Sequence, residues 1–570
     1  MIARVIIGVP TLIKGGFEYS FEGELKKFSL VKVPFRNSTE LGLVDAVYFK
    51  SLRKTKNIKS VISPGPVFTN EQSLLAQKIA EGYIASYEQT LLGFLPRLNL
   101  RDLQKLGGPG RLIKNKYGKT RLLLADLDQR TEYFWQSIPK DGQNLIILPG
   151  IKLIEKVYLR SKKYSLPDEI VLWHSAVKSG EKAKVWQKIL SGENITVVGT
   201  RDALLLPYRS LKVVFIDDPT NFAYQEDQRP YYHAYKVSAY LKNIFNASLI
   251  LGEDIPDLYS FVALKNKKIE LIEKDRKIKI VSLPQHEKAQ KHPDLFDDIL
   301  KGVNQNNKLC VIGPWRKEAR VVCQDCNSSV VCPACGGEHF DQKTNHCAQC
   351  LKINSVAICR NCKSSKLKYV GFSYKNIKDE LSRQFPKRAI AEADEDISRA
   401  DIVLTNLNQL DQLPPIFIKA YLPYFDLMQN NPNLGARQTL FKKIVSLRNF
   451  GIRDVYISKS DEEELLFVNW LKDGDWRSFL TDELKQRKEF GLPPYKKGVQ
   501  VVSKVSKSEK PPKIIADTLE KLKPFAKIID REKDKTLLIF DKSEYPQVMP
   551  HLRNLSEHNI RVESDPMELF

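Results

Sequence analysis

The chain has 570 residues, 42% of them apolar and 28% charged, with a formal net charge of +22. This length exceeds what one hydrophobic core supports, so we expect roughly three to five domains. No stretch approaches the ~20 apolar residues of a membrane-spanning helix. Lys14 and Glu18 close the apolar start MIARVIIGVP, which predicts a strand rather than a signal peptide. Because the positive charge is spread along the chain, it favours nucleic acid over an anionic membrane as partner, solubility alone being the alternative.

The first ~70 residues predict a small β domain. The short runs ARVIIGVP, FEYSF, SLVKVPF and LGLVDAVYF, separated by turns with Gly15, Gly16 and Pro34, are typical of a small barrel or sandwich. Thr69 and Asn70 can cap the helical pattern that follows. Residues 105–118, KLGGPGRLIKNKYG, are rich in glycine and lysine. We therefore expect a β domain over 1–70 and a helix with a linker over 71–118.

From residue 119 the pattern is that of parallel sheets covered by helices. The apolar runs TRLLLA, NLIILP, EIVLWH, ITVVGT, LKVVFIDD and ASLILGE lack polar alternation, as strands buried on both faces do. A second set comprises KLCVIG, RAIAEA, DIVLTN and DVYISK. These runs predict two α/β lobes, 119–275 and 285–485. The remaining residues, 486–570, predict a small α+β domain with the order β-α-β-α.

A cysteine-rich segment interrupts the second lobe. Eight of the nine cysteines lie between residues 323 and 362, in four Cys-x-x-Cys pairs. Such a turn directs two thiolates at one tetrahedral Zn²⁺, and two turns complete a closed, structural site. We therefore expect two zinc ions and a cytosolic protein whose thiols bind metal rather than form disulfides. The pairs are Cys323/Cys326, Cys332/Cys335, Cys347/Cys350 and Cys359/Cys362.

Four Cys-x-x-Cys turns can be paired in three ways. Adjacent pairing leaves only five residues between the first two turns, so we favour a nested arrangement. In this arrangement the outer set, Cys323, Cys326, Cys359 and Cys362, binds one zinc. The inner set, Cys332, Cys335, Cys347 and Cys350, binds the other. His339 and His346 lie within the segment and are alternative ligands, which eight available thiolates make unnecessary.

The two lobes and their inserted cysteine turns resemble the PriA (primosomal protein N′) family of bacterial replication-restart helicases. The resemblance implies a DNA 3′-end-binding β domain, two RecA-like lobes with a two-zinc insertion, and a C-terminal α+β domain. The winged-helix domain of the family has no counterpart, because only the 105–118 segment fills that interval. The segments that carry the resemblance are GGFEYSF, VKVPF, HSAVKSGEKAKVWQKILSGE (174–193), GTRDALLLPYRSLKVVFID (199–217), YQEDQRPYYHAYKVSAY (224–240), LILGEDIP (249–256), GLPPY (491–495) and DPMEL (565–569).

The family's ATP-binding motifs are degenerate in this sequence. The phosphate loop, normally Gly-rich and ending in Gly-Lys-Thr, corresponds to LLLADLDQRTEYF (122–134), which has no glycine and adds Asp126 and Asp128. Asp217-Asp218-Pro219-Thr220 replaces Asp-Glu-x-His, and Gly252-Glu253-Asp254-Ile255 replaces Gly-Ser-Ala-Thr. We therefore expect no binding of ATP or Mg²⁺ and no catalytic residue. The degenerate remnants are Arg130, Thr131, Asp217 and Asp218.

Two groups of residues are candidates for DNA binding. The resemblance implies a 3′-end pocket with Phe17, Glu18 and Lys59, in which Arg36 replaces a glycine and either blocks a base or holds a phosphate. A core role for Phe17 and a surface role for Glu18 are the alternatives. The second group lies in a loop whose aromatic and cationic side chains suit base stacking, core packing being the alternative. Its members are Tyr224, Arg229, Tyr231 and Tyr232.

These features together predict a PriA-like DNA-binding protein for replication restart that does not hydrolyse ATP. By resemblance its partners are forked, single-stranded or 3′-ended DNA, a single-stranded-DNA-binding protein and the primosome proteins that load the replicative helicase. It would act in the bacterial cytoplasm, at the nucleoid, without a membrane partner. Two alternatives stay open: an active 3′→5′ ATP-dependent helicase, and a zinc-stabilised protein-interaction scaffold that does not bind DNA.

Overall fold

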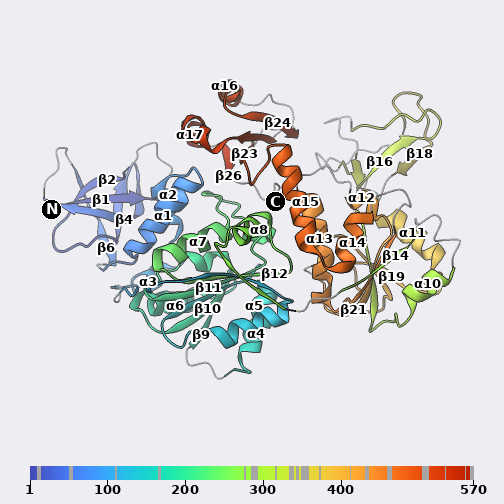
Figure 1. Cartoon of the computed structure of the whole chain (residues 1–570). Helices are drawn as coiled ribbons and strands as arrows, with labels where there is room; N and C mark the ends of the chain where they lie inside the picture. Colours follow the sequence, from blue (N-terminus) through green and yellow to red (C-terminus); the bar gives the residue numbers. More distant parts are fainter. Residues whose placement is uncertain are drawn as a thin grey trace. The chain divides into compact units, whose positions relative to one another are not determined.

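The computed structural model divides the chain into two compact units (Figure 1). Unit 1 comprises Met1–Lys274, Gln486–Lys504 and Pro511–Phe570, and unit 2 comprises Asp275–Lys485 and Val505–Lys510. The structure describes residues 1–8, 15–49, 55–63, 65–108, 112–164, 169–274, 278–283, 293–314, 318–332, 339–341, 346–347, 358–370, 374–407, 409–410, 413–429, 435–458, 465–502, 513–532, 535–558 and 560–564.

The N-terminal domain is a strongly curved six-stranded sheet with the order β5-β2-β1-β4-β3-β6. Alternate residues such as Val5, Tyr19 and Val33 point into one core. The edge strands β5 and β6 are consecutive in the chain, and the predicted small β domain is confirmed. The strands are β1 (Ile2–Ile7), β2 (Phe17–Ser20), β3 (Leu30–Phe35), β4 (Ser38–Tyr48), β5 (Lys56–Asn57) and β6 (Ser60–Ser63).

Three helices follow, α1 (Asn70–Gly82), α2 (Tyr87–Gly93) and α3 (Leu100–Leu103). The predicted cap is present at α1, because the Thr69 side chain accepts a hydrogen bond from the Gln72 amide and Gln72 returns one to the Thr69 amide. Helix α1 packs against α2 and against α7 (Ala234–Phe245) of the next domain. The helices therefore connect the β domain to the first lobe.

Lobe 1 is built on a seven-stranded parallel sheet with the order β13-β7-β12-β11-β8-β10-β9. All six predicted strands are present, and β13, a short acidic strand, escaped prediction because its sequence Glu-Leu-Ile-Glu has little apolar content. The strands are β7 (Thr120–Leu124), β8 (Gln143–Ile147), β9 (Glu169–Trp173), β10 (Ile195–Gly199), β11 (Leu211–Asp217), β12 (Ser248–Glu253) and β13 (Glu270–Glu273).

Helices cover both faces of this sheet. On one face Phe134 of α4 (Leu127–Ser137) and Ile154 of α5 (Ile151–Ser161) pack on Phe215 and its neighbours. The alternate strand residues, among them Val214, are also fully buried, and α7 contacts β11 there. The other elements of the lobe are α6 (Ser179–Ser191), α8 (Leu258–Lys265) and the 3-10 turns η1 (Arg201–Leu205) and η2 (Phe222–Tyr224).

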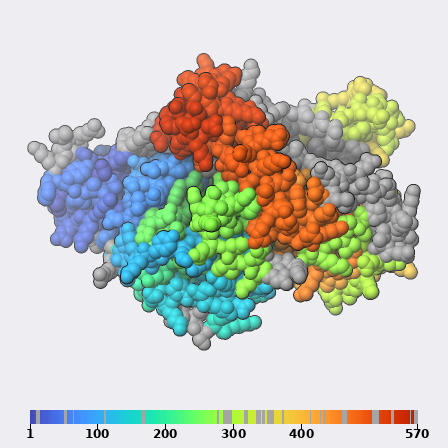
Figure 2. Space-filling model, viewed as in Figure 1, coloured from blue at the N-terminus to red at the C-terminus, as the bar shows by residue number. Residues whose placement is uncertain are grey.

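The C-terminal α+β domain belongs to unit 1. Its antiparallel sheet has the order β24-β25-β23-β26, which gives two strands more than the predicted β-α-β-α pattern. Ile84, between α1 and α2, is buried among Val499, Leu552 and other residues of this domain, which lies directly against the N-terminal part of the unit in Figure 2. The elements are β23 (Lys497–Val502), α16 (Lys513–Leu522), β24 (Lys527–Glu532), β25 (Lys535–Phe540), α17 (Tyr545–Glu557) and β26 (Arg561–Ser564).

Unit 2 contains the second parallel sheet, with the order β14-β22-β21-β15-β20-β19. The four predicted strands are confirmed, and β14 and β21 are additional. The strands are β14 (Lys279–Leu283), β15 (Lys308–Ile312), β19 (Ile390–Glu392), β20 (Ile402–Thr405), β21 (Phe417–Leu422) and β22 (Asp454–Ser458). The helices are α10 (Pro293–Leu300), α11 (Tyr374–Gln384), α12 (Phe425–Gln429), α13 (Ala436–Ser446), α14 (Leu465–Asp473) and α15 (Trp476–Glu489).

The cysteine-rich insertion of unit 2 forms a small antiparallel sheet with the order β17-β16-β18. Its strands are β16 (Glu318–Cys323), β17 (His339–Asp341) and β18 (Leu367–Val370). The two-lobed α/β fold with a cysteine insertion is thus as predicted. Among the described residues, none of the helices combines the length and apolar character needed to cross a membrane.

Candidate functional site

The carboxyl edge of the lobe 1 sheet, where the family's nucleotide would bind, contains a buried ion pair. Arg130 lies on α4 directly after β7, and Asp217 ends β11, two strands away. The Arg130 Nε atom donates to Asp217 Oδ1 at 2.6 Å, and both side chains are buried. The Arg130 Nη1 atom donates to the Ala125 carbonyl at 2.6 Å. Arg130, which by resemblance stands where the phosphate-loop lysine belongs, therefore binds Asp217, the first acid of the degenerate Asp-Glu-x-His motif.

A second carboxylate and a glycine complete this cluster. Asp254, which follows β12, lies 3.5 Å from Arg130 Nη1. A Cβ atom at Gly252 would lie 2.8 Å from the Arg130 side chain, so the absence of a side chain there makes room for the guanidinium. Burial raises the pKa of Asp217 to about 6 in spite of the opposing charge of Arg130. The nearby acids raise the pKa of Arg130 against the effect of burial.

The amino end of α4 is closed by its own side chains. Asp126 accepts a hydrogen bond from the Gln129 amide at 2.8 Å, and the Gln129 side chain accepts one from the Asp126 amide at 3.2 Å. Thr131 donates to the Leu127 carbonyl at 2.8 Å, within its own helix. A carboxylate thus takes the place where helix amides would meet a phosphate.

Asp218, the fourth remnant, lies in a turn at the end of β11 with φ of +49°. Its amide donates to the Gly252 carbonyl at 2.7 Å, and its side chain accepts from Asn221 Nδ2 at 2.8 Å. These hydrogen bonds give Asp218 a turn-forming role at the end of β11. The four remnants therefore form a filled, internally paired edge of the sheet.

The outer cysteines of the insertion lie together. The sulfur atoms of Cys323, Cys326, Cys359 and Cys362 all lie within 4.8 Å of one another. The Cys323–Cys362 and Cys326–Cys359 sulfur distances are 3.4 and 3.6 Å. Four thiolates at ~2.3 Å from a tetrahedral Zn²⁺ would be ~3.8 Å apart, so this set fits a Cys₄ zinc site.

Both turns of this cluster have the same backbone geometry. Asn327 and Lys363 each follow the second cysteine of a pair, with φ of +54° and +61°. The Cys323 amide donates to the Ser328 carbonyl, and the Cys359 amide donates to the Ser364 carbonyl in the same way. Repeated turns of this kind point two thiolates to one centre. Sequence spacing alone was enough to find them.

For the inner set the structure describes Cys332 and Cys347, while Cys335 and Cys350 lie outside the described residues. Cys332 and Cys347 are both buried in one small cluster with Val321 and Phe340. The second and third turns are therefore close in space, as nested pairing requires. Of the two histidines, His346 is described and half-buried, and the side chain of His339 lies outside the description.

Three of the four predicted 3′-end residues lie around the β3–β4 hairpin. The ring of Phe17 packs on Phe35 with centroids 5.1 Å apart, and the Arg36 guanidinium lies 5.4 Å from the Phe35 ring centre. Arg36 is exposed in the two-residue turn with φ of +49°. Lys59 is exposed and donates to the Thr39 side chain. These side chains form a small cationic and aromatic surface.

Glu18 is separated from this surface by the alternation of the strand. Phe17 contributes to the core of the β domain, as its core interpretation expected, so the adjacent Glu18 points to the opposite face of the sheet. There Glu18 accepts a hydrogen bond from the Tyr48 hydroxyl at 2.8 Å. The predicted pocket residues are thus not all on one side of the sheet.

Two tyrosines of the predicted DNA-binding loop are core residues, which corrects their predicted role as stacking platforms. Tyr224 is fully buried, and its hydroxyl donates to the carbonyls of Ile147 and Asp217 at 3.1 and 2.6 Å. Tyr232 is buried as well. Burial raises the pKa of both hydroxyls well above the ordinary value. A ring enclosed in this way has no face available to a base.

The other two loop residues contact the C-terminal domain. Arg229 Nη2 donates to the Ser556 carbonyl at 2.8 Å, and the Arg561 guanidinium lies 4.6 Å from the Tyr231 ring centre. Tyr231 is half-buried. The exposed aromatic of this loop is instead Phe222, with 79% of its surface accessible. Sequence spacing gives no indication of these contacts, since their partners lie more than 300 residues away.

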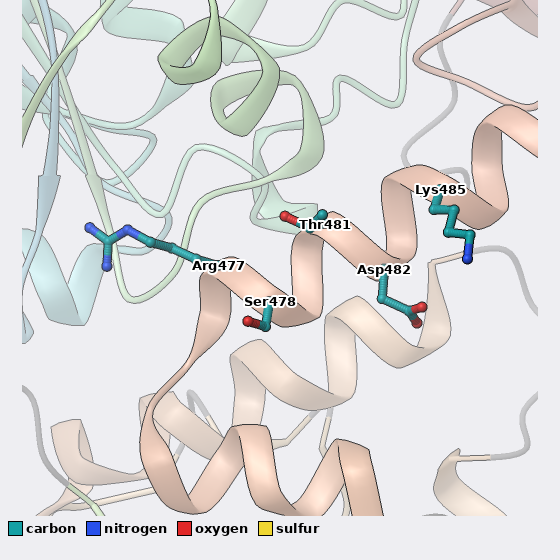
Figure 3. A pocket seen from close by; sticks show the side chains of 5 residues that line it. All are labelled: Arg477, Ser478, Thr481, Asp482 and Lys485. Atoms are coloured by element: carbon teal, nitrogen blue, oxygen red, sulfur yellow. The ribbon is translucent and has the colours of Figure 1, made fainter.

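A shallow hollow of about 390 Å³ lies along α15 in unit 2. Figure 3 shows that successive turns of this one helix carry its lining side chains, Arg477, Ser478, Thr481, Asp482 and Lys485. Asp482 is 3.6 Å from Arg437 of α13. In the described part of the chain, none of the residues predicted for ATP, zinc or DNA lines this hollow.

Taken together, the fold and sites define a helicase-like α/β protein with a cluster of four cysteines and a cationic β domain. Residues 4–96 match the 3'DNA-binding domain (3'BD) of PriA. The chain is 25% identical to replication restart protein PriA of Rickettsia typhi, over 88% of this chain and 87% of that protein. For the PriA proteins of Borreliella burgdorferi and Helicobacter pylori the identities are 23% and 27%, over 72% and 68% of this chain.

Over most of its length the chain is similar to PriA replication restart proteins. The alignments with the Borreliella and Helicobacter proteins span 66% of each relative, just under two thirds of their length. Among solved structures, RecG bound to a three-way DNA junction has 11% identity and a TM-score of 0.36, covering 74% of this chain and 47% of RecG. Yeast Dbp5 bound to RNA has 11% identity and a TM-score of 0.35, covering 68% and 97%.

Proposed function

We propose that this chain is a DNA-binding replication restart protein that does not hydrolyse ATP. It would bind forked, single-stranded or 3′-ended DNA in the bacterial cytoplasm and help load the replicative helicase. The match of residues 4–96 to a 3'DNA-binding domain supports DNA binding, and a net charge of +22 favours it. A single-stranded-DNA-binding protein and primosome proteins are the proposed protein partners.

The loss of ATP hydrolysis rests on the buried pair between Arg130 and Asp217. A bound Mg²⁺–triphosphate would need Asp217 to leave Arg130, and separating a buried ion pair costs about 3–5 kcal/mol. The phosphates would then meet the Asp126 carboxylate at the amino end of α4 instead of a glycine-rich loop. Each of these features opposes nucleotide binding, and their combined effect supports a DNA-binding role without hydrolysis.

The test is a pair of measurements on the purified full-length protein. A fluorescent fork, with either a free or a blocked 3′ end, is titrated at ~50 mM and ~200 mM salt, and ATP hydrolysis is followed with and without the fork. We expect binding that weakens steeply with salt and no hydrolysis above background. DNA-stimulated hydrolysis abolished by Asp217→Ala would overturn the proposal, and undetectable binding at low salt would favour the scaffold.

We also propose that the insertion holds two structural zinc ions, one on each nested cysteine set. Four thiolates leave no open coordination position, so the metal would stabilise the insertion and do no chemistry. Metal analysis of the purified protein is expected to give two zinc ions per chain. The variants Cys359→Ser/Cys362→Ser and Cys347→Ser/Cys350→Ser should each retain about one. Loss of both ions, or of neither, in the second variant would contradict the nested arrangement.

A further inference from the structure

The segment 112–119, of which residues 112–118 are predicted to belong to a linker, is held against lobe 1 directly before β7. We call residues 112–119 the strap. The Ile113 amide donates to the Arg209 carbonyl at 2.7 Å, and the Asn115 amide donates to the Phe245 carbonyl at 3.1 Å. The Leu249 amide donates to the Lys119 carbonyl at 2.9 Å. The strap therefore crosses the amino ends of β11 and β12.

Two residues fix the strap in place. The side chain of Asn115 donates to the carbonyls of Leu211 and Phe245 at 2.8 and 3.1 Å. A Cβ atom at Gly118 would lie 2.0 Å from the Ala247 carbonyl oxygen, so only glycine allows the backbone to approach this closely. The strap is thus a positioned element, and the side chains it presents have a defined location.

The exposed residues of the strap include an aromatic ring and two cations. Tyr117 has 79% of its surface accessible. Lys114 and Lys116 are exposed, and neither has an ion-pair or hydrogen-bond partner among the residues that the structure describes. The two lysines flank the anchored Asn115, and both are open to solvent. An exposed phenol offers a ring face for stacking, and unpaired ammonium groups attract an anionic partner.

We propose that the strap is a second DNA contact, which binds single-stranded DNA by stacking a base on Tyr117 and pairing phosphates with Lys114 and Lys116. The inference rests on the proposed DNA-binding function and adds a site to it. A tyrosine ring that projects freely can accept the face of an unpaired base, whereas stacked bases in a duplex do not offer one. Tyr117 directly follows Lys116, so the strap can contact a base and an adjoining phosphate of one strand together.

The strap is separate from the other sites in unit 1. It lies at the amino edge of the lobe 1 sheet, whereas Arg130 and Asp217 lie at the carboxyl edge. Strand β11 has seven residues, so the two edges are roughly 20 Å apart. The strap is also outside the matched 3'DNA-binding domain, which covers residues 4–96. A variant of the strap therefore leaves both of these sites unchanged.

The test compares strap variants of the full-length protein in titrations with a fluorescent oligothymidine and with a fork. Tyr117→Leu should weaken binding of the oligothymidine about five-fold or more, and Tyr117→Phe, which keeps the ring, should not. Lys114→Gln/Lys116→Gln should reduce the slope of log affinity against log salt by about 1.4, because each phosphate contact to a single strand contributes ~0.7. The matched control is Lys178→Gln/Lys184→Gln, two exposed lysines of the same lobe near α6.

A crosslinking experiment gives an independent readout. An oligonucleotide with bromouracil is irradiated with the wild-type protein, and the crosslinked peptide is identified by mass spectrometry. We expect a crosslink at Tyr117 that Tyr117→Leu removes. If the fork is bound but neither the affinity nor the salt slope responds to the strap variants, the strap inference is wrong while the proposed function stands. If the wild type binds no DNA at all, both fail.

Discussion

The two edges of the lobe 1 sheet differ in whether their charged side chains are buried and paired or exposed to solvent. At the carboxyl edge a guanidinium and two carboxylates are buried and bound to one another through Arg130, Asp217 and Asp254. At the amino edge the side-chain amide of Asn115 is bound to lobe 1, whereas the ammonium groups of Lys114 and Lys116 lie in solvent. Charges that are paired inside a protein are neutralised by one another, and charges left outside are available for a partner. The difference separates the structural edge from the binding edge.

The largest effect should come from breaking the buried cluster. Arg130→Met keeps much of the side-chain volume but leaves Asp217 and Asp254 without their cation. We expect the free energy of unfolding to fall by about 3–5 kcal/mol at neutral pH, because an unpaired buried charge is costly. Urea unfolding followed by circular dichroism measures this change. Arg160→Met is the control, since Arg160 pairs with the exposed Asp128 and should cost at most about 1 kcal/mol. Equal effects of the two variants would contradict the comparison.

A pH effect should be next in size. Burial lowers the pKa of His233 from 6.5 to about 4, and its Nδ1 atom accepts a hydrogen bond from the Tyr235 amide at the start of α7. The unfolded chain therefore binds this proton more readily, and the free energy of unfolding falls as the pH drops from about 6.5 towards 4. At pH 5 the loss should reach about 2 kcal/mol.

Asn at position 233 can still cap the helix but does not titrate. The loss of stability between pH 7 and pH 5 should therefore be smaller in His233→Asn than in the wild type. Urea titrations of both proteins at each pH give the difference. An unchanged pH dependence would show that other groups cause the loss.

At the amino edge the anchor of the strap should have a smaller effect on stability. Asn115→Ala removes two hydrogen bonds to the carbonyls of Leu211 and Phe245, so we expect a loss of about 1–2 kcal/mol. The same variant should weaken binding of single-stranded DNA, because the strap is no longer fixed. Asn115→Gln is the matched control, because it keeps the amide group but carries it on a side chain that is one methylene longer. Loss of stability with unchanged DNA binding would separate the anchor from the binding role.

The smallest effect on stability should come from the exposed lysines. Lys114→Gln/Lys116→Gln should change the free energy of unfolding by less than about 0.5 kcal/mol, because surface substitutions without partners are nearly neutral. Thermal or urea unfolding in low salt measures this. A destabilisation similar to that of Asn115→Ala would mean that these side chains hold the strap instead of facing a partner.

Much of the fold could be predicted because it depends on local pattern. Runs such as NLIILP and ITVVGT are apolar throughout, and strands of this kind are stable only when helices cover both faces. In the two lobes the missed strands, β13, β14 and β21, contain charged residues within the run, including Lys419 in the centre of the second sheet. Lys419 donates to the Asp298 carbonyl, a contact that no local pattern predicts.

The sites were predictable to different degrees. The outer cysteines could be grouped because Cys-x-x-Cys spacing itself sets the geometry of the turn. The pairing of Arg130 with Asp217 joins residues 87 positions apart, so the sequence indicated the loss of the motif but not what replaced it. Tyr224 and Arg229 share one loop, yet one is core and the other an anchor for the C-terminal domain. Composition cannot distinguish these roles, since burial depends on the partner segment.

The burial of Ile84 in the C-terminal core affects how the protein can be made. Unit 1 is formed by residues on both sides of unit 2 in the sequence. During translation its N-terminal part therefore cannot complete its fold until residues 275–485 have been synthesised. During that interval the hydrophobic surface around Ile84 and the loop at Arg229 lack the segment that covers them. Unit 2 is continuous apart from one short piece and can fold meanwhile. The nascent chain should therefore need chaperone protection at its N-terminal part until the last ~85 residues emerge.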